Sequence, residues 1–218
     1  MASMNYIQLV NDVLVRLREP EASSVSDTAY VKLIAKFVND SKRVVEDAYN
    51  WNALSETLSA TTTADVFNYV LVGSGQRFRV IDVINDTSNI FVELAATKWM
   101  DQQFLMTTPQ KGSPAYYNFN GTNSNGDTQV DLFPIPNGSY NIRFNIIKPQ
   151  EPLAVNADTL LVPHEPVILG ALARAQAERG EDGGVQAGET YQLMRQSLAD
   201  AIALESGRYL EEQEWLAV

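Results

Sequence analysis

Residues 163–180 read Pro-His-Glu-Pro-Val-Ile-Leu-Gly-Ala-Leu-Ala-Arg-Ala-Gln-Ala-Glu-Arg-Gly, and this stretch decides how the rest of the chain is arranged. Pro166 suits the first turn of a helix, and Gly180 suits its end. Between them the residues are unusually small: Gly170, Ala171, Ala173, Ala175 and Ala177. Small side chains let neighbouring helices approach closely, so we expect this helix at the centre of a bundle.

Partners for such a central helix are found at both ends of the chain. Apolar residues recur at helical spacing within 5–50 and 166–210, which predicts helices over 5–18, over 28–50 and after Gly184. Pro20 ends the first helix, and Ser26 or Asp27 can cap the second. The apolar faces are Tyr6, Ile7, Leu9, Val10, Val13, Leu14 and Leu17 in the first helix, Tyr30, Ile34, Phe37, Ser41, Val44 or Val45, and Ala48 in the second, and Tyr191, Met194, Leu198, Ile202 and Tyr209 in the last.

The middle of the chain follows a different period. Residues 57–148 alternate in twos and are interrupted by Gly, Pro and Asn, which is typical of strands joined by turns. We expect an extended segment over 57–65 and strands over 66–72, 78–84, 90–94, 115–119, 129–133 and 140–147, while residues 97–106 are ambiguous, with one or two helical turns as the candidate structure.

The predicted fold class is therefore α+β, a helical bundle formed by N- and C-terminal helices with an inserted β-rich sub-domain. We expect the bundle over 1–56 and 163–210, the insertion over 57–150, a linker over 151–162 and a C-terminal docking tail over 211–218.

Composition argues against an enzyme. The 218 residues contain no cysteine and a single histidine, which excludes the usual zinc ligand sets. His164 lies between two prolines with no nucleophile motif nearby, so a structural or exposed imidazole is the favoured interpretation. No stretch approaches the ~18 apolar residues of a membrane span. We expect no catalytic residue, no metal and no cofactor.

The charge is negative and uneven. The net charge is −11, and the stretch from Glu178 to Glu214 carries nine acids and three bases. Such a surface repels phosphate backbones, which disfavours DNA binding through counterion release. A solvated acidic helix face is the plain interpretation, and a surface that lies near nucleic acid without binding it is the alternative.

Two segments are candidates for contact with partners. In the tail, Leu210, Trp215 and Leu216 accompany three glutamates, so the tail alone cannot bury the indole, which is expected either to be disordered in the monomer or to dock on a partner. In the middle block, the polar run Thr122, Asn123, Ser124 and Asn125 is expected at an exposed hairpin tip.

Trp51 and Trp99 are expected in the core. The aromatics at 116, 117 and 119 lack the interleaved basic residues of a base-stacking surface.

The two ends of the chain also resemble a known family. Arg18-Glu19-Pro20 with the Ser-rich loop, Glu46-Asp47-Ala48-Tyr49-Asn50-Trp51-Asn52, and Arg179-Gly180-Glu181-Asp182-Gly183 resemble head-to-tail adaptors of short-tailed bacteriophages, of the tail tubular protein A type. The similarity covers 5–56 and 163–210.

That resemblance implies a structural virion protein at the head-tail junction, assembled in the host bacterial cytoplasm. Such adaptors form a ring, usually of twelve copies, beneath the portal protein. The implied partners are the portal, neighbouring adaptor subunits and a nozzle or tail protein, with genomic DNA passing through the channel without specific binding and with no membrane. The alternative is a non-enzymatic monomeric binding module that uses the β insertion to hold a peptide or protein partner.

Overall fold

The computed structural model describes residues 3–180 and 184–208, which belong to two compact units. The helical unit comprises Met1–Leu54 and Pro149–Val218, and the β unit comprises Ser55–Lys148. The two ends of the chain thus form one helical bundle, and the strands form an insertion within it. This arrangement confirms the α+β class predicted from the change in period.

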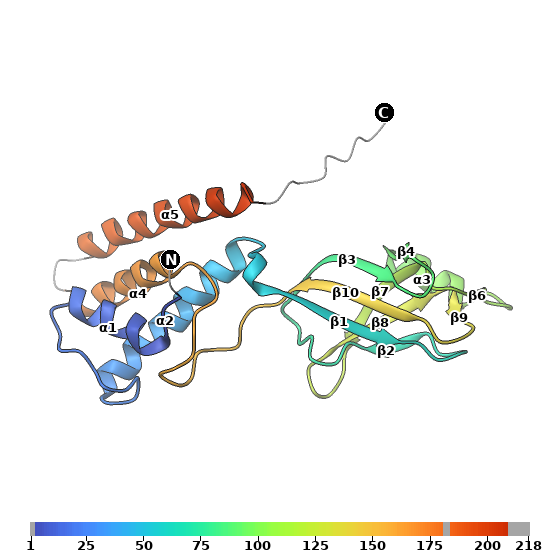
Figure 1. Ribbon diagram of the computed structural model, residues 1–218, viewed down its shortest axis with the longest axis horizontal. Coiled ribbons are helices and arrows are strands. Elements are labelled where there is room, and N and C mark those ends of the chain that lie inside the picture. Colours follow the sequence, from blue (N-terminus) through green and yellow to red (C-terminus); the bar gives the residue numbers. More distant parts are fainter. Residues whose placement is uncertain (1–2, 181–183, 209–218) are drawn as a thin grey trace. The chain divides into compact units, whose positions relative to one another are not determined.

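The helical unit is built around α4, as its small residues predicted. Its helices are α1 (Tyr6–Arg16), α2 (Ala29–Ala48), the 3-10 turn η1 (Asn52–Leu54), α4 (His164–Arg179) and α5 (Val185–Ser206). Figure 1 shows α4 between α5 and α2, and α4 also contacts α1. Residues on every side of α4 are buried, including Val167, Ile168, Ala171 and Ala175.

Local sequence signals set the helix ends. Asn5 begins α1 with a reciprocal capping box to Gln8, and Gly180 ends α4 in the left-handed conformation that glycine tolerates. The side chain of Thr28 caps α2, where Ser26 or Asp27 was expected. Asp27 is engaged elsewhere, because its carboxylate accepts hydrogen bonds from the backbone N–H groups of Ser23 and Ser24.

Polar side chains of α2 hold the segment that returns from the β unit. Asn39 bonds both the N–H and the carbonyl of Leu153. Lys42 donates to the carbonyls of Gln150 and Glu151 and pairs with Glu46 at 2.9 Å. Both charged side chains are buried, so this contact is a fixed part of the interior.

The β unit contains two four-stranded sheets and a small two-stranded one. Its elements are β1 (Ser55–Thr61), β2 (Asn68–Val70), β3 (Arg79–Asn85), β4 (Ile90–Phe91), β5 (Glu93–Leu94), α3 (Thr97–Phe104), β6 (Lys111–Gly112), β7 (Tyr116–Thr122), β8 (Thr128–Phe133), β9 (Ile135–Pro136) and β10 (Asn141–Ile147). The ambiguous segment 97–106 is thus largely helical. The two larger sheets have the strand orders β1-β10-β3-β4 and β2-β8-β7-β5.

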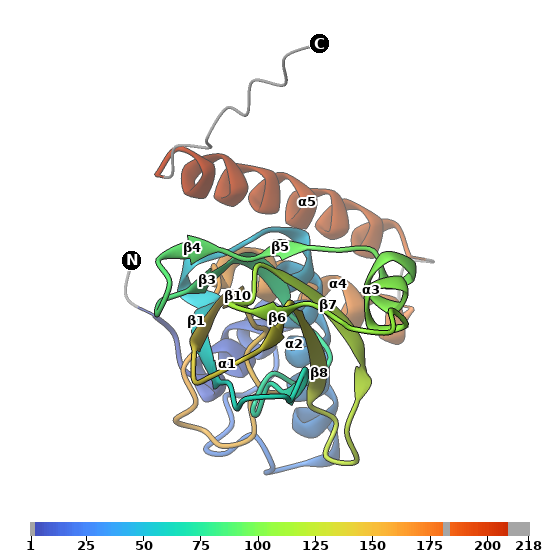
Figure 2. The same cartoon turned by 90° about the vertical axis from the view of Figure 1, so that its right-hand side faces the viewer.

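One hydrophobic core joins the two larger sheets. Figure 2 looks roughly along the strands, with β1, β10 and β3 on one side and β7 and β8 on the other. The buried residues come from both sheets: Ala60, Leu71, Val83, Val92, Tyr117, Val130, Leu132, Ile142, Phe144 and Ile146. Their alternation along each strand is the period of two that predicted this block.

The first and last strands of the β unit pair with each other. β1 and β10 are antiparallel over their whole length, from Ser55 opposite Ile147 to Thr61 opposite Asn141. The insertion therefore begins and ends at neighbouring positions.

Candidate functional site: interaction surfaces of the two units

The tip of the hairpin between β7 and β8 carries the four predicted interface residues of the β unit. Thr122, Ser124 and Asn125 are exposed. Asn123 is half-buried, and its side-chain oxygen accepts the N–H groups of Asn125 and Asp127. The tip is therefore a hydrogen-bonded turn that leaves three polar side chains exposed.

The base of the tip is fixed by a second loop. The Asp127 carboxylate accepts hydrogen bonds from the N–H groups of Gly73 and Gly75. The N–H of Thr128 donates to Ser74 Oγ. The backbone N–H groups of the two glycines in this loop thus bind a carboxylate of the hairpin.

The three predicted interface residues of the tail, Leu210, Trp215 and Leu216, lie outside the described residues. The same holds for Tyr209, the last member of the predicted apolar face of the final helix. Their role at an interface stays a prediction.

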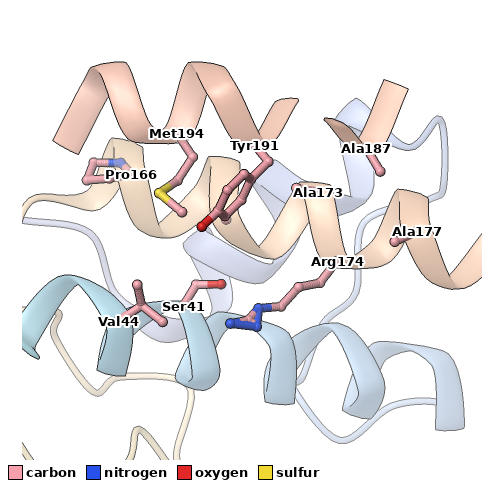
Figure 3. Close-up of a pocket in the computed structure, with 10 residues that line it drawn as sticks. Ser41, Val44, Pro166, Ala173, Arg174, Ala177, Ala187, Tyr191 and Met194 are labelled. Atoms are coloured by element: carbon pink, nitrogen blue, oxygen red, sulfur yellow. The ribbon is translucent and has the colours of Figure 1, made fainter. Parts of the chain in front are cut away.

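The helical unit contains a groove that the sequence did not predict. It has a volume of about 370 Å³ and lies between α2, α4 and α5, with small residues of α4 as its floor (Figure 3). Its lining is Ser41 and Val44 from α2, Pro166, Gly170, Ala173, Arg174 and Ala177 from α4, and Ala187, Tyr191 and Met194 from α5.

The apolar face of α5 explains why this groove is open. Met194 is buried against α4, but Tyr191 is 50% exposed, and Leu198 and Ile202 are only half-buried. The predicted apolar face of the last helix is therefore only partly buried among the described residues. Across the groove, Val44 of α2 is 40% exposed.

Two polar groups stand out in this apolar lining. Ser41 is 3% exposed, and its Oγ has no hydrogen-bond partner among the described residues. In Figure 3 the hydroxyl of Tyr191 points across the groove toward Ser41, and the side chain of Arg174 extends from α4 toward α2. Among residues 3–180 and 184–208, no ion pair or hydrogen bond engages the Arg174 side chain.

The close packing of the floor also involves Ser41. A Cβ added to Gly170 would lie 3.0 Å from Ser41 Oγ and 3.1 Å from Ser41 Cβ. Glycine at 170 therefore allows α2 and α4 to approach closely at this point. The one sequence signal for the groove was a serine within the apolar face of the second helix.

Two of the segments that carried the family resemblance meet in the structure. Arg179 at the end of α4 forms an ion pair with Glu19 and donates to Leu17 O and Tyr30 Oη. The hydrogen bond to Tyr30 raises the pKa of Arg179. Arg18 nearby has φ 60°, a left-handed conformation, and α1 ends at Arg16 where the pattern predicted Arg18. These residues join the two chain ends.

The tryptophans divide between core and surface. Trp51 is 2% exposed, and its indole N–H donates to Val45 O, as expected of a core residue. Trp99 is 37% exposed and packs edge-on against Tyr116 and Phe133 on the β unit, so its assignment to the core was wrong.

Within the described ranges, no group of three His, Cys, Asp or Glu side chains is arranged to hold a metal ion. His164 is the first residue of α4. None of the described helices is long and apolar enough to cross a membrane.

The described residues thus form a helical unit made from both chain ends and a β insertion, with an exposed hairpin tip on the β unit and an open groove on the helical unit. The family model described as SU10 adaptor protein matches residues 4–213, so the chain belongs to this family of phage head-to-tail adaptors. The match extends over both units and confirms the adaptor resemblance seen at the chain ends. No curated protein matches the chain.

Proposed function

We propose that this adaptor is a subunit of a homo-oligomeric ring, of twelve copies, docked beneath the portal at the capsid vertex. The ring extends the DNA channel and is the platform for the nozzle or tail protein. The observation that carries this proposal is the family match over residues 4–213, which includes the helical unit and the β insertion alike.

The helical unit offers the two different surfaces that a ring requires. A closed ring uses head-to-tail contacts, in which one face of a subunit meets a different face of the next. One candidate face is the groove between α2, α4 and α5. The other is the outer side of α5, where Val185, Leu193 and Leu204 are 60–71% exposed.

The charge supports a channel through which DNA slides. The chain has a net charge of −11, and a wall of this sign does not retain a phosphate backbone by releasing its counterions. Genomic DNA is therefore cargo of the channel, without specific binding. The exposed tip at 122–125 is a contact for a neighbouring subunit or the tail protein.

Particle mass and imaging test the proposal. The purified chain should form a ring near 290 kDa, twelve times 24.2 kDa, or add about that mass to its portal on docking, and averaged images should show the symmetry of the ring. The ring should not shift double-stranded DNA at low salt, where non-specific binding is strongest.

A species that stays at 24.2 kDa with portal present would reject the ring. If that monomer instead bound a peptide through its β unit, the protein would be a monomeric binding module. Replacing 122–125 with Gly-Ser should leave the melting temperature unchanged and weaken assembly. If the replacement lowered the melting temperature as well as assembly, the tip would be part of the folded core rather than a contact surface.

A further inference from the structure

We propose that the groove between α2, α4 and α5 binds the C-terminal segment, residues 210–218, of a second copy of this chain. Trp215 and Leu216 enter the apolar part, and the acidic stem lies against Arg174. This inference rests on the proposed homo-oligomer and names one of the contacts that link its subunits.

The groove has the size and chemistry for such a segment. Its volume of about 370 Å³ lies at the lower end of ligand sites, which commonly span about 300–1,000 Å³. The lining is mostly apolar, with exposed area left on Val44 and Tyr191. One large aromatic side chain with an aliphatic neighbour matches this space, and Trp215-Leu216 is such a pair.

The polar groups of the groove complement the segment. Ser41 Oγ is buried and without a partner among the described residues, and an indole N–H is a donor that needs an acceptor. Arg174 is the cation of the lining. The segment supplies Glu211, Glu212 and Glu214 with no basic residue, so its charge is opposite to that of the groove.

The length of the segment favours a second copy over the chain's own groove. Tyr191 lies 15 residues, or about 22 Å along the axis, before the end of α5 at Ser206. Trp215 is nine residues beyond Ser206, and a chain reversal uses about four of them. The remaining five span at most about 17 Å. The Cα atom of Trp215 therefore stops near the level of Met194, which lies 12 residues or about 18 Å before Ser206, and does not reach the part of its own groove at Tyr191, whereas a neighbouring subunit has no such restriction.

The first experiment measures the binding of a synthetic peptide, residues 209–218, by fluorescence anisotropy. The receptor is the full-length protein carrying Trp215→Ala and Leu216→Ala, so that its own segment does not compete. The peptide should bind, and a scrambled peptide should bind at least tenfold more weakly. Arg174→Glu in the receptor should weaken binding at least tenfold.

Ala177→Trp tests the location, because Ala177 is an exposed residue of the lining and a tryptophan there fills the groove. Ala203→Trp is the matched control on the outer side of α5. The first substitution should abolish peptide binding, and the second should leave it unchanged. Equal binding by both variants, or no binding by the parent receptor, would overturn the proposal.

Mixing two full-length variants shows whether the contact joins copies. Trp215→Ala/Leu216→Ala keeps the groove, and Ala177→Trp keeps the segment. Together they should form a heterodimer that neither forms alone, and a mixture that stays monomeric would overturn the proposal.

If Ala177→Trp forms rings like the parent but fails to join portal, the occupant is a portal segment. If no variant or parent forms rings while the peptide still binds in the groove, the proposed ring fails and the site stands.

Discussion

Lys42 and Glu46 are charged residues inside the helical unit. Their side chains are 3% and 2% exposed and 2.9 Å apart. Both side chains also form hydrogen bonds with the backbone. Lys42 donates to two carbonyl groups, and Glu46 accepts a hydrogen bond from the N–H of Gln150. A buried pair of this kind contributes little by itself, but each charge depends on its partner.

Lys42→Met should therefore be severely destabilising. It leaves the Glu46 carboxylate buried without its cation, which costs about 3–5 kcal/mol of the free energy of unfolding. Adding Glu46→Gln should recover part of this loss, because a neutral amide still accepts from Gln150. Chemical denaturation of the parent, both single variants and the double variant measures the coupling. Additive losses would show that the two charges do not interact.

Tyr6 gives the helical unit a specific dependence on alkaline pH. Its hydroxyl donates to Ala35 O and accepts from Asn39, and burial raises its pKa to about 12. In the unfolded chain a tyrosine loses its proton near pH 10. Between these two pH values Tyr6 loses its proton in the unfolded chain but keeps it in the folded protein. The free energy of unfolding is therefore unaffected below about pH 10 and falls by about 2–3 kcal/mol as the pH approaches 12.

Tyr6→Phe removes this titration. At about pH 9 the parent should be more stable by about 1 kcal/mol, the worth of the lost hydrogen bonds. Above about pH 11 the order should reverse, because only the parent loses stability at position 6. Denaturation of both proteins across this range checks the crossing. A constant difference would mean that the hydroxyl titrates normally.

At the scale of the helix, the packing of α4 against α2 depends on Gly170. Glycine within a helix usually costs about 1 kcal/mol relative to alanine, so its replacement is normally stabilising. Here a Cβ would lie 3.0 Å from Ser41 Oγ, on a neighbouring helix that must shift to admit it.

Gly170→Ala should thus destabilise the protein by about 1–3 kcal/mol through overpacking. Gly188→Ala is the matched control, since no heavy atom outside its own surroundings lies within 4 Å of a Cβ there, and it should gain about 0.5–1 kcal/mol. Thermal melting of the two variants should shift in opposite directions. A stabilised Gly170→Ala protein would show that the helices separate without cost.

The elements were largely predictable from the sequence, and the groove was not. Periodicity located every main helix and the longer strands because each spans several repeats of a strong pattern. Asn39, Lys42 and Glu46 showed no signal as a buried set, because their partners lie more than a hundred residues later in the chain. The groove exists because the apolar face of α5 is only partly covered. Hydrophobic periodicity shows which face of a helix is apolar, but it does not show which element packs on that face or how much of it is buried.

The union of the two chain ends determines stability at the scale of the whole molecule. Leu14 is 1% exposed in α1, which contacts both α2 and the later helix α4. Leu14→Asp should cost more than about 3 kcal/mol, as an unpaired charge in a core does. Leu204→Asp, at a residue 71% exposed, should change stability by no more than about 0.5 kcal/mol. Similar melting of both variants would contradict a shared core of the two ends.

Deleting residues 211–218 separates assembly from folding. The proposed contacts of this segment are with another copy, so the melting temperature of the monomer should stay nearly unchanged while ring formation weakens. Calorimetry and particle mass report these two effects independently. Earlier unfolding with intact assembly would place the segment in the core of its own subunit.

The pairing of Ser55 with Ile147 has a consequence for how such a chain changes over evolution. Directly opposed residues of an antiparallel pair lie only about 5 Å apart at their Cα atoms. A gene segment encoding any domain with adjacent ends can therefore be exchanged for residues 55–148 without lengthening the helical unit. The β unit is in this sense a separable insertion, whose sequence can change without moving the two ends of the helical unit that flank it.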